Sequence, residues 1–220
     1  MRGVHLNPTP LVYNLRMRPV IIVFAKAPTA GRVKTRLVPP LTPEAAAQLH
    51  TALVWDTIES LQQLRGVDLE LHTDIRTDAW TSAGVAQSLQ CEGDLGLKMF
   101  NALDAALRHG HERAMIAGSD APALPPDYCE QLLGAEEDVA LGPTEDGGYY
   151  AIACRRVHRN MFDRVEWSTE RTREQSIEAV RKCGLSLKLG PPWFDIDTPD
   201  DLARLKIVRG LGRHTAKLIL

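Results

Sequence analysis

The stretch that most constrains how this chain folds runs from Pro19 to Leu37 and reads PVIIVFAKAPTAGRVKTRL. Its first part, Val20–Ala25, is apolar and rich in β-branched residues, which is the pattern of a strand covered on both faces of a parallel sheet. Its second part is a loop that carries a glycine and three cationic side chains. A buried strand that releases a cationic loop at its carboxyl end indicates a site for a phosphate-rich ligand.

Four residues of this loop are candidate ligand-binding residues. Gly31 lacks a Cβ, so the backbone there can approach a ligand closely or adopt a positive φ. If the loop is extended, its period of two places Arg32, Lys34 and Arg36 on one side, as exposed charges that face the ligand. The alternative is an ordinary surface loop with solvated cations. The spacing is neither that of a Walker A loop nor G-x-G-x-x-G, so the loop by itself indicates an oxyanion-binding segment.

The composition excludes several classes of protein. With 220 residues, the chain is expected to form one α/β domain. A net charge of −2 argues against a nucleic-acid binder, whose footprint is basic. No segment has the roughly 18 apolar residues of a membrane span, and residues 1–16 lack the apolar run of a signal peptide. The four cysteines show no paired spacing, which predicts reduced thiols in a cytoplasmic protein.

The order of the predicted elements indicates a three-layer α/β/α fold. Strands are predicted at residues 20–25, 67–73, 85–90, 113–118, 138–143, 148–153 and 185–189, and helices at 43–64, 98–109, 128–133, about 169–183 and from 199 onward. Strands that alternate with helices predict a mostly parallel sheet. The Asp-Gly pair at 146–147 predicts one antiparallel hairpin. Ser168 or Thr169 is expected to cap the helix that follows.

Acidic residues recur where strand-like runs end. Asp120 follows the run at 113–118, at the place where open α/β sheets bind their ligands. Asp146 lies in the predicted hairpin turn, and Asp195 and Asp197 precede the last of these helices. Magnesium takes one or two carboxylates and completes its shell with water and phosphate oxygens. We therefore predict that Asp120, with Asp195 or Asp197, holds Mg²⁺ or Mn²⁺ opposite the cationic loop. The alternative is that these carboxylates cap turns or are solvated.

Two further positions are candidates for contacts to a base, a sugar or an acceptor. Asp94 could accept hydrogen bonds from a ligand, or it could cap the next helix. Gly147, which precedes another glycine, allows the close approach of a ligand or only a tight hairpin. The seven histidines show no metal-binding spacing and are expected to be structural or on the surface.

Six ordered motifs resemble a known family: FAKAPTAGRVKTRL, GDLGLKMFNAL, GSDAPAL, GPTEDGGYY, WST and DIDTPDDL. The chain resembles the bacterial "transferase 1" family, which is associated with radical-SAM and selenium-domain proteins and has the glycosyltransferase-A-like fold of nucleotide-diphospho-sugar transferases. At longer range it is similar to 2-phospho-L-lactate guanylyltransferase and molybdenum-cofactor guanylyltransferase. The resemblance covers about residues 18–206. It implies a single nucleotide-binding transferase domain at 18–207, with an N-terminal extension at 1–17 and a C-terminal tail at 208–220.

The resemblance also implies roles for individual residues. Lys34 and Arg36 fall in the phosphate loop of the family, Asp120 in its S-D-x-P metal element, Asp146 in D-G-G-Y-Y, and Asp195 and Asp197 in D-I-D-T-P. Nucleotidyl transfer from a nucleoside triphosphate to a small-molecule acceptor, with release of pyrophosphate, is the favoured activity. Lys34 and Asp120 are then the catalytic residues, which hold the phosphates and the Mg²⁺ or Mn²⁺ ion. The alternatives are glycosyl transfer from a nucleotide sugar and a non-catalytic nucleotide-binding protein.

Overall fold

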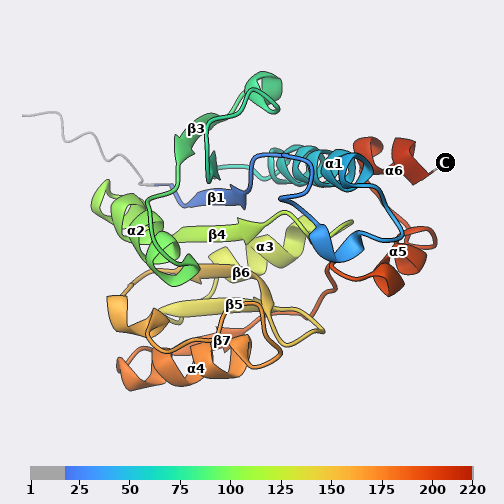
Figure 1. Ribbon diagram of the computed structural model, residues 1–220. Helices are drawn as coiled ribbons and strands as arrows, with labels where there is room; N and C mark the ends of the chain where they lie inside the picture. The colour runs from blue at the N-terminus through green and yellow to red at the C-terminus, as the bar shows by residue number, and fades with distance from the viewer. Residues whose placement is uncertain (1–17, 220) are drawn as a thin grey trace, which may run out of the picture.

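The computed structural model describes residues 18–219 and has a seven-stranded sheet between two layers of helices (Figure 1). The strands are β1 (Val20–Ala25), β2 (Asp68–Thr73), β3 (Ala86–Leu89), β4 (Ala114–Gly118), β5 (Val139–Pro143), β6 (Tyr149–Cys154) and β7 (Leu187–Leu189). The α-helices are α1 (Pro43–Leu61), α2 (Leu95–Arg108), α3 (Pro126–Leu133), α4 (Thr172–Lys182), α5 (Pro199–Leu205) and α6 (Arg213–Ile219), and the 3₁₀ helices are η1 (Thr35–Leu37), η2 (Thr81–Ala83) and η3 (Arg159–Phe162). None of the helices in this part of the chain is long and apolar enough to cross a membrane.

The strand order β3-β2-β1-β4-β6-β5-β7 confirms the predicted fold class. Strand β1 pairs in parallel with β2 and with β4, so the carboxyl ends of these three strands lie along one edge of the sheet. Strands β5 and β6 form the predicted antiparallel hairpin, and β6 also runs antiparallel to β4. The sheet is therefore mostly parallel with one antiparallel excursion.

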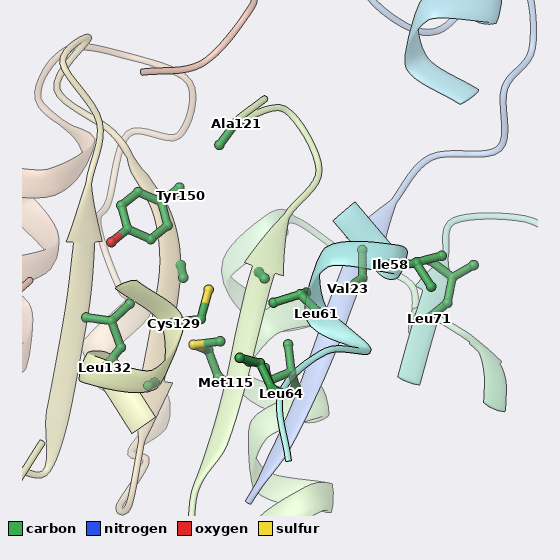
Figure 2. Close-up of a cluster of buried hydrophobic side chains, with 14 of the residues drawn as sticks. Val23, Ile58, Leu61, Leu64, Leu71, Met115, Ala121, Cys129, Leu132 and Tyr150 are labelled. Carbon is green, nitrogen blue, oxygen red and sulfur yellow. The ribbon is translucent and has the colours of Figure 1, made fainter. Parts of the chain in front are cut away.

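Alternate side chains of each central strand fill the two core layers. Ile21 and Val23 of β1 pack with side chains of α1 and α3, whereas Val20 and Ile22 pack with side chains of α2 and α4. Figure 2 shows the first of these clusters, with Met115 of β4 near its centre. Because β1 is covered on both faces, its sequence is apolar without interruption, as expected for a buried parallel strand.

Three helix starts differ from the prediction, and the start of α3 at Pro126 in place of residue 128 is the smallest of these differences. Asp94 Oδ1 accepts a hydrogen bond from the backbone amide of Leu97 at 2.8 Å, and this cap starts α2 before residue 98. Helix α4 begins at Thr172, and neither Ser168 nor Thr169 is its N-cap residue, so that prediction was wrong. The reason is that Ser168 has a left-handed backbone (φ 61°) and belongs to a separate turn before the helix.

The C-terminal segment folds back onto α1 (Figure 1). The carboxylate of Asp56 accepts hydrogen bonds from the backbone amides of His214 and Thr215, at 2.9 and 2.8 Å. The rings of Trp55 and His214 stack with their centroids 5.4 Å apart. The tail after residue 207 is thus packed against α1. The prediction that residues 1–17 form a separate extension lies outside the described residues.

Candidate active site

Three segments that are distant in the sequence meet where β1 and β4 end. The loop after β1 carries Lys34, the loop after β4 carries Asp120, and the segment before α5 carries Asp197. The backbone amide of Ile196 donates a hydrogen bond to the backbone oxygen of Asp120 at 2.9 Å, which joins the last two segments. This is the edge of the sheet at which open α/β folds bind their ligands.

The ammonium group of Lys34 occupies the centre of this site. Its Nζ lies 2.7 Å from Asp120 Oδ1, 3.0 Å from Asp197 Oδ1 and 2.5 Å from the carbonyl oxygen of Ile196. We call these three oxygens the oxygen shell. The Lys34 side chain is 4% exposed, whereas those of Asp120 and Asp197 are 45% and 38% exposed. The two carboxylates therefore keep a side open to solvent, and the ammonium group does not.

The loop after β1 is not extended, which corrects the prediction that its three cations point to one side. Lys34 adopts a left-handed backbone conformation (φ 47°, ψ 37°), and η1 follows it directly. Lys34 consequently turns inward, while Arg32 and Arg36 stay exposed. Leu37 anchors the turn, because it is fully buried in a cluster that includes Phe194 and side chains of α1.

Opposite charges stabilise the ionised forms of Lys34 and Asp120. Burial lowers the pKa of Lys34, but the charges of Asp120 and Asp197 outweigh burial and raise that pKa above its usual value. Burial likewise raises the pKa of Asp120, but the Lys34 charge is the main effect that opposes it, and the net shift of the Asp120 pKa is downward. At neutral pH Lys34 is therefore an ammonium ion and Asp120 is a carboxylate.

A second group of carboxylates lies beside this centre. Burial, followed by the negative charges of Asp146 and Asp197, raises the pKa of Asp195 to about 7. Asp146 is fixed by its own turn, in which Oδ1 accepts hydrogen bonds from Thr144 Oγ1 at 2.5 Å and from the Gly148 amide at 2.9 Å. This concentration of negative charge favours the binding of a cation.

A cavity of about 270 Å³ opens next to these carboxylates. It is lined by Arg36, Glu145, Asp146, Ser168, Thr169, Glu170, Phe194, Asp195, Asp197, Thr198, Asp201 and Arg204. A larger cavity of about 410 Å³ lies between α1 and α3, but none of the predicted site residues lines it. We assign the smaller cavity to the site, because four of the predicted site residues line it: Arg36, Asp146, Asp195 and Asp197. Lys34 and Asp120 do not line it, but Lys34 contacts Asp197.

The predicted glycines have different surroundings. Gly147 has φ 93°, and a Cβ at this position would lie 2.0 Å from the backbone oxygen of Glu170. The close approach at Gly147 is thus made by the turn that contains Ser168 and Glu170, which forms one wall of the cavity. Gly31 has φ 77° and no atom within 4 Å of the place where a Cβ would lie, so the described residues leave it open to a ligand.

Two of the other predicted residues are used in different ways. Arg36 Nη1 lies 3.9 Å from Asp197 Oδ2, and the side chain is 61% exposed, so it is available beside the centre. Asp94 caps α2 and does not line the cavity, which is the second of the two roles that its sequence context allowed. The structure therefore brings together Lys34, Arg36, Asp120, Asp146, Asp195 and Asp197.

Sequence reasoning missed the residues that brace the site. Arg204 of α5 forms a two-bond ion pair with Glu145, at 2.5 and 3.0 Å, and its guanidinium carbon lies 3.8 Å from the ring centroid of Phe194. His50 of α1 is buried, and its Nε2 lies 2.8 Å from the carbonyl oxygen of Lys26, at the base of the cationic loop. The sequence around Arg204 and His50 does not indicate these roles, because both contacts depend on how the helices pack. The WST motif was the available signal for the turn at 168–170.

The residues of the oxygen shell fit a divalent cation. Two carboxylate oxygens and one carbonyl oxygen converge on a single point, and hard divalent cations bind such oxygens. Asp120 Oδ1 is buried and has no hydrogen bond of acceptable geometry among residues 18–219, although Lys34 Nζ is 2.7 Å away. The short distance indicates an ion pair, and the poor geometry leaves this oxygen without a well-directed donor.

Fold and site together define the class of the protein. A solved structure from Desulfovibrio desulfuricans G20, provisionally described as a nucleotide-diphospho-sugar transferase, is 28% identical with a TM-score of 0.80, and the match covers 91% of this chain and 96% of that chain. The protein is thus a transferase with the nucleotide-diphospho-sugar transferase fold, as predicted. Residues 47–169 match the profile of the family described as uncharacterized proteins conserved in bacteria (DUF2064), and the chain belongs to this family.

Two further proteins illustrate the range of similar chains. The 2-phospho-L-lactate guanylyltransferase of Methanosarcina mazei is 24% identical over 190 residues, which cover 81% of this chain and 83% of that protein. This confirms the resemblance that the motifs indicated. The glucosyl-3-phosphoglycerate synthase of Mycobacterium tuberculosis, solved with Mn²⁺, UDP and glucosyl-3-phosphoglycerate, is 11% identical with a TM-score of 0.53, over 92% of this chain and 77% of that chain. The second likeness concerns the fold alone.

Proposed function

We propose that this protein is a divalent-metal-dependent nucleotidyltransferase, which transfers a nucleoside monophosphate from a nucleoside triphosphate to a small acceptor and releases pyrophosphate. The observation that carries the proposal is the convergence of Asp120 and Asp197 on one point at the ends of β1 and β4, which the Lys34 ammonium group occupies and near which Arg36 lies. The similarity to a guanylyltransferase over most of the chain supports nucleotidyl transfer and makes GTP the first triphosphate to test.

The proposed roles follow from the positions of the residues. Asp120 and Asp197, with the carbonyl oxygen of Ile196, would hold Mg²⁺ or Mn²⁺, and the bound ion would neutralise charge on the phosphates. The Mn²⁺ in the structural neighbour from Mycobacterium tuberculosis supports a divalent ion in this fold. Lys34 and Arg36 would bind phosphate oxygens, because these are the cations at and next to the proposed metal position, with Lys34 3.0 Å and Arg36 3.9 Å from Asp197.

The chemical step needs little covalent work from the protein. An oxygen of the acceptor attacks the α-phosphorus, and a new P–O bond forms while the bond to the bridging oxygen breaks. Pyrophosphate leaves with that electron pair, and an acceptor hydroxyl would release its proton to water. The contribution of the chain is to align the two reactants and to place cationic groups next to the charge on the leaving pyrophosphate.

Glycosyl transfer from a nucleotide sugar is the second candidate, and the composition of the cavity favours it. The lining combines the carboxylates of Asp146 and Asp195 with the hydroxyl groups of Ser168 and Thr169. Such a set can both accept hydrogen bonds from sugar hydroxyls and donate to them. The neighbour that was solved with UDP and glucosyl-3-phosphoglycerate is consistent with this alternative.

Calorimetry on the full chain with Mg²⁺ distinguishes the two candidates. GTP, ATP, CTP and UTP are compared with UDP-glucose and GDP-mannose, each with Mg²⁺ and with EDTA. For nucleotidyl transfer we expect one triphosphate to bind at least about tenfold more tightly than either nucleotide sugar, a difference of roughly 1.4 kcal/mol, and only when the metal is present. A preference for a nucleotide sugar would favour glycosyl transfer.

A product assay completes the test. An α-³²P-labelled triphosphate is incubated with the protein and a deproteinised bacterial extract that supplies small-molecule acceptors. Nucleotidyl transfer moves the label to a new compound and releases pyrophosphate in equal amount. Release of a nucleoside diphosphate from a nucleotide sugar would replace this proposal with glycosyl transfer, and tight binding without any turnover would leave a nucleotide-binding protein.

A further inference from the structure

The ammonium group of Lys34 lies where the proposed metal ion would bind. Its three neighbours, which form the oxygen shell, are the atoms of Asp120, Asp197 and Ile196 that the proposed function assigns to the metal. An ammonium group and a divalent ion cannot occupy the space between the same oxygens at the same time. Their positive charges also repel one another. Metal binding at this shell therefore requires Lys34 to leave it.

The fold holds Lys34 in this position. Its side chain is 4% exposed, whereas that of Arg36, two residues further along the same loop, is 61% exposed. Lys34 also has φ 47°, a left-handed conformation that residues with a Cβ adopt infrequently. A lysine that binds phosphate from an exposed position would have a side chain as exposed as that of Arg36. Lys34 is instead enclosed as the counter-ion of two carboxylates.

We propose that Lys34 is a built-in counter-ion that fills the divalent-cation position while the nucleotide is absent. The inference rests on the proposed function, because it requires phosphates to bind beside Asp120. The phosphates of an incoming nucleotide offer Lys34 new anionic partners at the moment when the metal displaces it from the carboxylates. The metal then binds weakly by itself and tightly together with the nucleotide.

The charge balance of the centre supports the exchange. The carboxylates of Asp120 and Asp197 with the Lys34 ammonium group leave one net negative charge, whereas the same carboxylates with a divalent ion are neutral. The exchange therefore completes the neutralisation of the carboxylates and frees a cation for the phosphates. The neighbouring charges are consistent with this exchange. The carboxylates of Asp146 and Asp195 line the adjoining cavity, and the Arg36 guanidinium group lies 3.9 Å from Asp197.

A competing arrangement leaves Lys34 in place. The Asp120 side chain is 45% exposed, so a metal ion could bind its accessible surface together with Asp195 and avoid the oxygen shell. In this arrangement Lys34 would be a permanent structural ion-pair partner. The two arrangements differ in the effect expected on removal of Lys34: exclusion of the metal from the shell predicts a large gain in affinity, whereas a metal outside the shell predicts only the smaller gain that follows the loss of a nearby positive charge.

Mn²⁺ binding to the full chain without nucleotide, measured by electron paramagnetic resonance of the free ion, separates them. We expect Lys34→Met to bind Mn²⁺ at least about tenfold more tightly than wild type, because the competing charge is removed and the oxygens are released. Arg36→Met is the matched control. It removes an exposed positive charge 3.9 Å from Asp197 that lies outside the shell, and should change the affinity by less than about threefold.

If Lys34→Met binds Mn²⁺ with the same affinity as wild type or more weakly, the proposal is overturned. An equal gain in Mn²⁺ affinity in Arg36→Met also overturns it, because the gain would then come from the loss of any nearby positive charge. The double variant Lys34→Met with Asp120→Asn should lose the gained affinity. In EDTA, Lys34→Met should melt below wild type, since two carboxylates lose their counter-ion, and Mn²⁺ should raise its Tm more than that of wild type.

A crystallographic test on the wild-type chain does not depend on any variant. Crystals without nucleotide are soaked in MnCl₂. A Mn²⁺ anomalous peak within bonding distance of the Asp120 carboxylate, with Lys34 still in its three contacts, would overturn the proposal. A peak at Asp120 that is found only after a triphosphate is added would support it. None of these measurements needs turnover, so failure of the nucleotidyl-transfer assay and failure of the counter-ion exchange are observed separately.

Discussion

The backbone amide of Ile196 donates to the backbone oxygen of Asp120, so the acidic segment before α5 is bonded directly to the loop after β4. Ile196 is buried, and Asp195 and Asp197 on either side of it are partly exposed. Asp197 shares the Lys34 ammonium group with Asp120, whereas Asp195 forms no ion pair with it within residues 18–219, and after burial the charge of Asp146 contributes most to the raised pKa of Asp195. This geometry favours Asp197 over Asp195 as the partner of Asp120 in metal binding.

The first prediction ranks these carboxylates. Asp120→Asn and Asp197→Asn should each weaken Mg²⁺-dependent GTP binding by more than about tenfold, because each removes a charged oxygen ligand. Asp195→Asn should change it by less than about threefold, since its carboxylate lies outside the oxygen shell. Calorimetry with GTP, in Mg²⁺ and in EDTA, measures the effect. Loss of binding in Asp195→Asn, with normal binding in Asp197→Asn, would reverse the assignment.

The second prediction concerns pH in the metal-free protein. Burial and the neighbouring charges of Asp146 and Asp197 raise the pKa of Asp195 from 3.8 to about 7. Between these values the folded chain binds a proton that the unfolded chain has lost, so this group's contribution to the free energy of unfolding falls as the pH rises. Asparagine does not titrate, so Asp195→Asn lacks this pH-dependent decrease in the free energy of unfolding. In EDTA, the free energy of unfolding of the variant minus that of wild type should increase by on the order of 2 kcal/mol from pH 4 to pH 7 and then level off.

Urea unfolding of both proteins across this pH range measures the difference. A constant difference in stability would show that Asp195 titrates in its usual range. The comparison between variant and wild type cancels the titration of the groups that do not interact with Asp195, which the two chains share.

The third prediction tests the wall of the cavity. Gly147→Ala places a Cβ 2.0 Å from the backbone oxygen of Glu170 and imposes φ 93° on alanine. Gly184→Ala is the matched control, because Gly184 also has a positive φ (69°) but no atom within 4 Å of the added Cβ. Gly147→Ala should therefore destabilise the protein by at least about 2 kcal/mol more than Gly184→Ala. Equal losses of stability in urea would show that the turn at 168–170 moves away freely.

The fourth prediction concerns the two ends of the chain. Removal of residues 208–220 should lower the Tm by roughly 5 °C or more, since Asp56 loses two hydrogen bonds and Trp55 loses its stacking partner. Removal of residues 1–16 is the comparison: their polar, proline-interrupted sequence predicts an unchanged Tm. Differential scanning calorimetry of both truncated chains measures the shifts. An unaffected Tm after the C-terminal deletion would show that the docked tail adds no stability.

The layers of the fold and the location of the site follow from local features of the sequence. The uninterrupted apolar run of β1 is stable only between two helix layers, and Thr42 before Pro43 starts α1, where its hydroxyl accepts a hydrogen bond from the Ala45 amide. The position of Asp120 after β4 follows from parallel topology. These features were predictable because periodicity, helix caps and the alternation of strands and helices are properties of residues close to one another along the chain.

The groups that meet at the site, in contrast, are selected by the packing of distant segments. Lys34 and Asp197 are 163 residues apart, and their contact depends on the left-handed turn at Lys34, which the burial of Leu37 anchors. The period-two argument failed there because it assumes an extended backbone, and local propensity disfavours a left-handed lysine. The absence of a Cβ at Gly147 likewise makes room for the backbone of Glu170, a contact that no spacing in the sequence indicated. Contacts of this kind follow from the packing of segments that are distant in the sequence, where burial of one side chain sets the direction of the next.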